Sequence, residues 1–75
     1  MDMLIRRLRD LREDKDLTQK QVAEFLRIPE RTYGNYEMGV RNIPIELLIE
    51  LSNFYEVSVD YLLDLTNQKK RYTKK

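Results

Sequence analysis

The chain spaces its apolar residues three and four positions apart, in short runs separated by polar or proline-containing breaks. Leu4, Leu8 and Leu11 show this spacing near the N-terminus, and it is the period of a helix with one apolar side. No segment alternates apolar and polar residues at the period of two that a strand would show. Only two glycines and two prolines interrupt the 75 residues. The pattern therefore predicts an all-α fold built from short helices.

Five helices are predicted. They cover about residues 2–14, about 18–27, from Pro29 to about Met38, a stretch that begins at Pro44, and from Val59 to about Leu65. Thr18 with Gln21 three residues later forms a capping box, and Ser58 is a cap for the last helix. Gly39 is expected to end the third helix in the left-handed conformation. The apolar side of the fourth helix is predicted to comprise Ile45, Leu48, Ile49, Leu51 and Phe54.

Composition excludes several function classes. The chain has no histidine and no cysteine, which removes the commonest general base, the commonest metal ligand and every thiolate site. We therefore expect no enzymatic activity, no metal and no cofactor. The segment 1–10 has too short an apolar run for a signal peptide, and the charged fraction of 36% argues against a membrane span. The sequence predicts a cytoplasmic protein.

The net charge of +1 conceals two oppositely charged parts. Five of the 14 basic residues lie after Thr66, which leaves nine against all 13 acidic residues, a net charge of −4 within the first 65 residues. We expect one domain over residues 1–65 and a flexible basic tail over residues 66–75. The tail is either an arm that adds non-specific affinity for phosphate or only a solubilising end.

Residues 17–39 read LTQKQVAEFLRIPERTYGNYEMG. Two short helices joined by a tight turn, with the small Ala23 in the first, have the spacing of a helix-turn-helix. At 100° per residue the second of these helices has one polar side, opposite Tyr33 and Tyr36. That side consists of Glu30, Arg31, Gly34 and Asn35.

The chain resembles the phage-repressor type of helix-turn-helix domain, also called Cro-like or Xre-like. The matching motifs are LTQ at 17–19, Ala23, Tyr36-Glu37-x-Gly39, Arg41-Asn42 and VSVDYLL at 57–63, and the resemblance covers about residues 4–65. It implies a compact five-helix lambda-repressor-like domain, with the helix-turn-helix at about residues 18–38. It also implies a transcriptional regulator, a repressor, that binds double-stranded DNA. Such a protein binds a pseudo-palindromic operator as a homodimer, with the third helix in the major groove.

The resemblance also implies roles for individual residues. Base-reading positions are Glu30, Arg31 and Asn35. Positions at or near the DNA backbone are Thr18, Gln19, Thr32, Arg41 and Asn42. Arg12 and Glu37 occupy the places of an ion pair that links the first and third helices. Arg31 has the chemistry to contact guanine, and Asn35 to contact adenine.

The sequence departs from the family pattern at helix ends and inside the third helix. Arg27 and Glu56 stand where the family commonly has glycine, so either the backbone differs there or a left-handed residue is strained. Pro29 replaces a capping serine. Gly34 lies inside a predicted helix, where glycine is unfavourable, and our hypothesis is that it lets the helix approach the bases more closely.

Two surfaces leave alternatives open. Arg6, Arg7 and Arg9 form either a phosphate-binding patch or, as we favour, partners for acidic residues of the same helix. The fifth helix has more apolar residues than so small a domain can cover, so we predict a dimer surface of Val59, Tyr61, Leu62 and Leu65. The acidic body favours one alternative function, a protein-interaction module of the antitoxin or adaptor kind that binds a partner protein.

Overall fold

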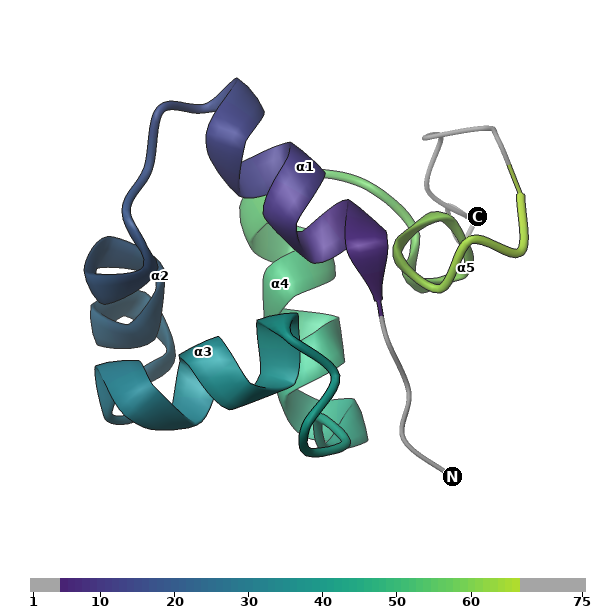
Figure 1. The fold of residues 1–75 in the computed structure, drawn as a ribbon. Coiled ribbons are helices and arrows are strands. Elements are labelled where there is room, and N and C mark those ends of the chain that lie inside the picture. The colour runs from purple at the N-terminus through teal and green to yellow at the C-terminus, as the bar shows by residue number, and fades with distance from the viewer. Residues whose placement is uncertain (1–4, 67–75) are drawn as a thin grey trace.

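The computed structural model describes residues 5–66, and this range contains five α-helices and no strand (Figure 1). The helices are α1 (Arg6–Asp14), α2 (Gln19–Leu26), α3 (Glu30–Glu37), α4 (Ile45–Tyr55) and α5 (Val59–Leu62). The predicted five-helix all-α fold is confirmed, although α5 is shorter than expected. The predicted start of the first helix near residue 2 and nearly all of the predicted tail lie outside the described residues. No helix among residues 5–66 is long and apolar enough to cross a membrane.

Local sequence signals explain three of the helix ends. The Thr18 hydroxyl accepts a hydrogen bond from the Gln21 backbone N–H at 3.1 Å, and the Thr18 N–H donates back to the Gln21 side chain at 2.9 Å. This reciprocal pair is the predicted capping box. Ser58 caps α5 with a single bond, accepting from the Tyr61 N–H at 2.9 Å. Gly39 follows α3 with φ 77°, the left-handed conformation predicted for it.

The two residues that stand in place of glycine at helix ends adopt the left-handed backbone conformation that glycine favours. Arg27 ends α2 with φ 61°, and Glu56 ends α4 with φ 57°. Both values lie in the left-handed region, where a side chain crowds the following carbonyl. The family geometry is therefore retained at these turns, with strain in place of the glycine.

All five helices contribute to one core. Its fully buried large side chains come from α1, α2, α3, α4 and α5 respectively: Leu8, Val22, Tyr33, Leu51 and Leu62. The small Ala23 is 2% exposed in α2, which packs closely against α3. This contact fixes α3 along the lower edge of the molecule in Figure 1.

The predicted apolar side of α4 is partly wrong. Leu48 and Leu51 are buried as expected, but three other members of that side, Ile45, Ile49 and Phe54, are exposed. Ser52 and Tyr55 are buried in their place. Apolar residues occur all around this helix, so the spacing alone does not single out the side that packs.

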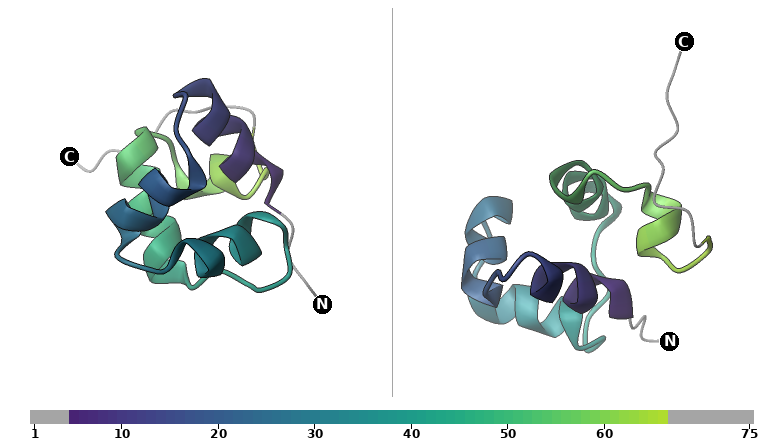
Figure 2. Two further views of the ribbon diagram at one scale, coloured as in Figure 1. Left: turned by 60° about the vertical axis from the view of Figure 1, so that its left-hand side comes forward. Right: turned by 90° about the horizontal axis from the view of Figure 1, so that it is seen from above.

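The short helix α5 is attached to α1 by Arg7. The Arg7 guanidinium donates to the backbone carbonyls of Tyr61 at 3.0 Å and Thr66 at 2.6 Å. It also pairs with Asp64 at 3.1 Å and lies 3.9 Å from the centroid of the Tyr61 ring. The turned views place α5 at the end of the molecule away from α2 (Figure 2). Arg7 thus joins α1 to α5, whereas Arg9 pairs with Glu13 of its own helix at 3.1 Å, as favoured from the sequence.

Candidate nucleic-acid interface

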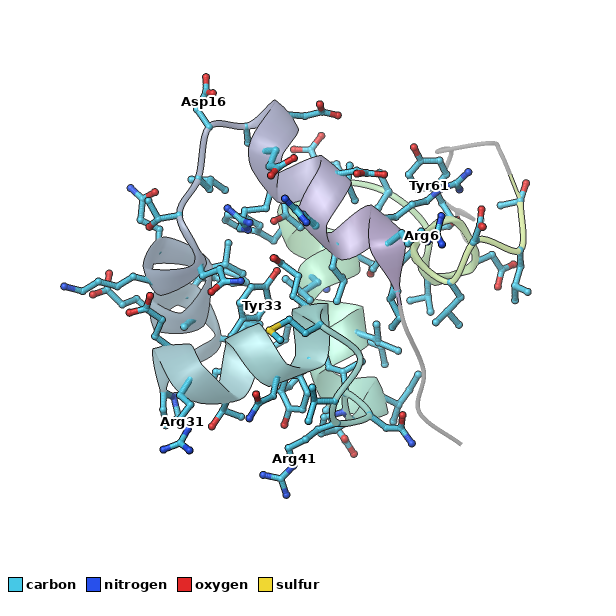
Figure 3. All side chains as sticks on the ribbon, viewed as in Figure 1. Arg6, Asp16, Arg31, Tyr33, Arg41 and Tyr61 are labelled. Atoms are coloured by element: carbon cyan, nitrogen blue, oxygen red, sulfur yellow. The ribbon has the colours of Figure 1, made fainter. Side chains whose placement is uncertain are left out.

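The polar side of α3 faces away from the body of the domain. Glu30 and Arg31 are exposed and Asn35 is half-buried, whereas Tyr33 is completely buried. Figure 3 shows Arg31 pointing outward from α3 and Tyr33 lying on its inner side. Burial is the first cause that raises the pKa of the Tyr33 hydroxyl, so this group stays protonated. The periodicity of the sequence thus predicts which side of α3 is free.

A shallow, open groove runs along this exposed side and reaches the start of α2. It is lined by Gln19, Glu30, Arg31, Gly34, Asn35 and Met38. The structure thus brings the three expected base-reading residues together with Gln19. Met38, which is 67% exposed, is an addition to the predicted set. Its position four residues after Gly34, on the same helical side, is the signal that could have identified it.

Of the predicted backbone-contacting residues, only Gln19 lines this groove. Arg41 and Asn42 are exposed in the segment after α3, and Figure 3 shows Arg41 pointing away from the body on the same side as Arg31. Thr18 is exposed at the start of α2, although its hydroxyl already caps that helix. Thr32 is half-buried. Two arginines thus extend from the same edge of the molecule.

An ion pair ties α1 to the end of α3. Arg12 donates to both carboxylate oxygens of Glu37, from Nε at 2.8 Å and from Nη2 at 3.0 Å. A third donor, Nη1, bonds the Leu17 carbonyl at 2.8 Å, just before α2. The side chains are only 14% and 3% exposed. The structure therefore brings together the two residues that the resemblance pairs, in a bidentate and largely buried contact.

Glu37 remains ionised despite its burial. Burial acts most strongly and opposes the charge, but hydrogen bonds from Arg12 and Gln19 outweigh it and hold the pKa of Glu37 below its ordinary value. The same hydrogen bond to Glu37 is the first cause that raises the pKa of Arg12. A charged network thus connects three helices and reaches the groove through Gln19.

Gly34 lies directly beneath Gln19. A β-carbon at position 34 would stand 3.3 Å from Gln19 Oε1, and Gly34 is itself buried. The space left by the missing side chain is therefore filled by Gln19. The hypothesis that the missing side chain admits a closer approach of bases stays a prediction, and the Gln19 amide is the neighbour beside this position.

The predicted dimer surface is only partly available. Leu62 is fully buried in the core, so its assignment to that surface is wrong: it is the residue by which α5 packs inward. Val59 and Tyr61 are half-buried, and Leu65 is 72% exposed. The exposed apolar surface at this end is therefore smaller than the sequence suggests.

Comparisons with known proteins agree on one family. The helix-turn-helix family model matches residues 8–62. The uncharacterized HTH-type transcriptional regulator YobD of Bacillus subtilis is 43% identical over 65 residues, covering 87% of this chain and 58% of YobD. The HTH-type transcriptional regulator ImmR of Bacillus subtilis is 43% identical over 58 residues, covering 77% of this chain and 46% of ImmR.

A phage protein is among the relatives as well. The transcriptional repressor RstR of the cryptic phage CTXphi, from Vibrio cholerae, is 34% identical over 61 residues, covering 81% of this chain and 55% of RstR. No solved structure gives a significant match. The chain spans about half the length of the curated relatives it matches. With a family model matched over residues 8–62 and relatives at this identity, the chain belongs to the Xre-like helix-turn-helix family.

Proposed function

We propose that this chain is a sequence-specific DNA-binding transcriptional regulator that acts as a repressor. A dimer occludes a promoter by binding a pseudo-palindromic operator, with α3 of each copy in the major groove. The observation that carries the proposal is the outward polar side of α3, where Glu30, Arg31 and Asn35 line one groove. Relatives named as transcriptional regulators and as a phage repressor support it.

The residues on this side have the chemistry of base recognition. The Arg31 guanidinium donates in a bidentate manner to O6 and N7 of guanine, and the Asn35 amide pairs with N6 and N7 of adenine. Each such contact discriminates against the wrong base by about 1–3 kcal/mol. Glu30 either accepts from the cytosine amino group or repels phosphate, which sharpens the choice of site.

Residues around the groove supply contacts to the DNA backbone. Arg41 and Asn42 are exposed just after α3, and Arg41 extends on the same side as Arg31 (Figure 3). Gln19 begins α2, where unpaired backbone N–H groups favour a phosphate. Thr18 and Thr32 flank this region. These contacts fix the orientation of α3 without reading sequence.

Dimerisation through α5 and the residues after it gives the operator its symmetry. Val59, Tyr61 and Leu65 are the apolar residues that a second copy covers in this proposal. Two copies related by a two-fold axis place their α3 helices about 34 Å apart, on successive turns of the major groove. Sedimentation at high micromolar protein, with and without operator DNA, tests this step; a monomer under both conditions refutes the dimer.

Selection of bound sites from a random DNA pool tests the function. We expect an enriched palindrome whose enrichment is lost with Arg31→Ala. The matched control is Lys15→Ala, which removes one exposed positive charge beside Asp16, at the far end of the molecule from Arg31 in Figure 3. This control should retain the palindrome. Equal loss in both variants would show that only charge, and not base recognition, is involved.

The acidic body supports one alternative, a module that binds a partner protein. The first 65 residues carry a net charge of −4, which opposes DNA over most of the surface. Failure to enrich any sequence even at low salt would refute specific DNA binding and favour this alternative.

A further inference from the structure

Gln19 is held in one orientation by a residue of another helix. Its Nε2 donates to Glu37 Oε1 at 3.0 Å, and Glu37 is itself fixed by the bidentate contact with Arg12. One amide N–H of Gln19 is thus already bonded, so the side chain lies across α3 instead of extending from the start of α2. Gln19 lines the groove together with Arg31 and Asn35.

The Gln19 amide lies close to the place that a side chain at position 34 would take. A β-carbon there would be 3.3 Å from Gln19 Oε1, 3.8 Å from Cδ and 3.9 Å from Nε2. All three atoms of the amide group therefore cover Gly34. A β-carbon at this position would therefore force the Gln19 amide to shift by a few tenths of an ångström.

The backbone gives no other reason for a glycine here. Among the described residues the glycine with a positive φ is Gly39, whereas Gly34 lies within α3. Glycine in a helix interior is less favourable than alanine. Its presence at position 34 thus has a packing explanation in Gln19.

We propose that Gly34 is a positioning residue for DNA recognition, because its missing side chain seats Gln19 across α3 against Glu37 as a fixed wall of the groove. The inference rests on the proposed DNA binding. Gly34 itself touches no DNA in this scheme. It acts through Gln19, whose fixed amide loses no side-chain freedom when DNA binds.

The first experiment examines the free protein. In Gly34→Ala we expect the Gln19 side-chain amide resonances to shift in a ¹⁵N–¹H spectrum. We also expect the pKa of Glu37 to rise towards its ordinary value, because one of the hydrogen bonds that lower it is weakened. The variant should fold, because alanine favours the helix. Unchanged Gln19 resonances and an unchanged Glu37 titration overturn the proposal.

The second experiment is a double-mutant cycle on the DNA site selected with the wild-type protein. Gly34→Ala should weaken binding about three- to tenfold, the effect of disturbing one hydrogen-bonded contact. In a Gln19→Ala background the same substitution should have no further effect, because Gly34 acts only through Gln19. Equal weakening in both backgrounds, or no weakening in the wild-type background, refutes the role of Gly34.

The two experiments separate this inference from the proposed function. If the wild-type protein selects no DNA site, the function fails, and the positioning role for DNA recognition fails with it. If the wild-type protein binds a selected site and Gly34→Ala binds it equally well, the function stands and the role of Gly34 is refuted.

Discussion

Glu37 is an ionised carboxylate that is almost completely buried. Arg12 supplies the opposite charge and two of its hydrogen bonds. Removing Arg12 would leave that charge without its bidentate contact. Breaking a buried pair in this way destabilises a protein by about 3–5 kcal/mol. We therefore expect Arg12→Ala to lose at least about 3 kcal/mol of unfolding free energy, measured by urea denaturation at pH 7.

The exposed pair Arg9–Glu13 supplies the control for this substitution. Its side chains are 68% and 54% exposed, and such pairs contribute about 0–1 kcal/mol. Arg9→Ala should therefore be nearly neutral. If Arg12→Ala were as stable as Arg9→Ala, the ion pair would have no structural role, and it could not fix the angle of α3.

The depressed pKa of Glu37 makes stability depend on pH. A carboxyl group whose folded pKa lies below its unfolded pKa stabilises the fold above the unfolded value, near 4.5, and loses this contribution as pH falls through the folded value. We expect the unfolding free energy to decline between pH 5 and the acid limit, as followed by urea denaturation at each pH. Glu37→Gln should flatten this decline. If Glu37→Gln left this pH dependence unaltered, the decline in unfolding free energy would be due to other carboxylates.

Single residues were predictable where their chemistry is local. Thr18, Gln21 and Ser58 cap helices through partners three residues away, and the sequence displays that spacing directly. The contact between Gly34 and Gln19 joins two helices, so nothing in the spacing of either helix reveals it. The resemblance supplied the Arg12–Glu37 pair because those two positions are part of its pattern.

At the scale of the elements, α5 depends on a contact that sequence periodicity does not contain. A helix of four residues has little stability of its own, and Arg7 holds both its carbonyl end and the Tyr61 ring. We expect Arg7→Ala to speed amide hydrogen exchange at residues 62–65, whose N–H groups form the last turns. The amides of α2 should be unaffected.

Asp64→Asn is the matched test of how Arg7 acts. It removes the ion pair, whose Asp64 side chain is 77% exposed, but leaves the bonds from Arg7 to backbone carbonyls. Exchange at residues 62–65 should then change much less than in Arg7→Ala. An equal change in both variants would assign the attachment to the ion pair alone.

The ends of α2 and α4 are strained by side chains in the left-handed conformation. Arg27→Gly should raise the unfolding free energy by about 0.5–1 kcal/mol, because relief of that strain exceeds the extra freedom that glycine gives the unfolded chain. Urea denaturation measures the change. Glu24→Gly, in the ordinary helical part of α2, should lower stability by about 1 kcal/mol. A loss in both variants would contradict the strain.

The order of the helices was predictable from the sequence, and the packing of α4 was not. Its residues IELLIELSNFY are so rich in apolar side chains that more than one side satisfies helical spacing. The neighbouring helices select Leu48, Leu51 and Tyr55 for burial, a choice that depends on how the elements pack. In α3 the polar and apolar sides are distinct, so the exposed side could be predicted.

For the whole molecule, the separation of charge along the chain predicts how DNA binding responds to salt. Residues 67–75 carry five basic side chains. If these side chains contact phosphate, their deletion should make the slope of log K for DNA binding against log salt concentration less negative, by as much as about four to five. Titrations of the selected site between 50 and 200 mM salt measure the slope. An unchanged slope would leave the tail a solubilising role only.

The residues with left-handed backbone are positions where substitution by glycine can raise the stability of the domain. Asp16, Arg27, Glu56 and Asp64 all have positive φ without being glycine, and none lines the groove of α3. Glycine at Arg27 and Glu56 offers stability from outside the recognition surface, and well-separated gains add. A higher unfolding free energy lets a protein tolerate destabilising substitutions elsewhere. Under the proposed function, the operator preference should therefore be redesignable at Glu30, Arg31 and Asn35 on a stabilised background.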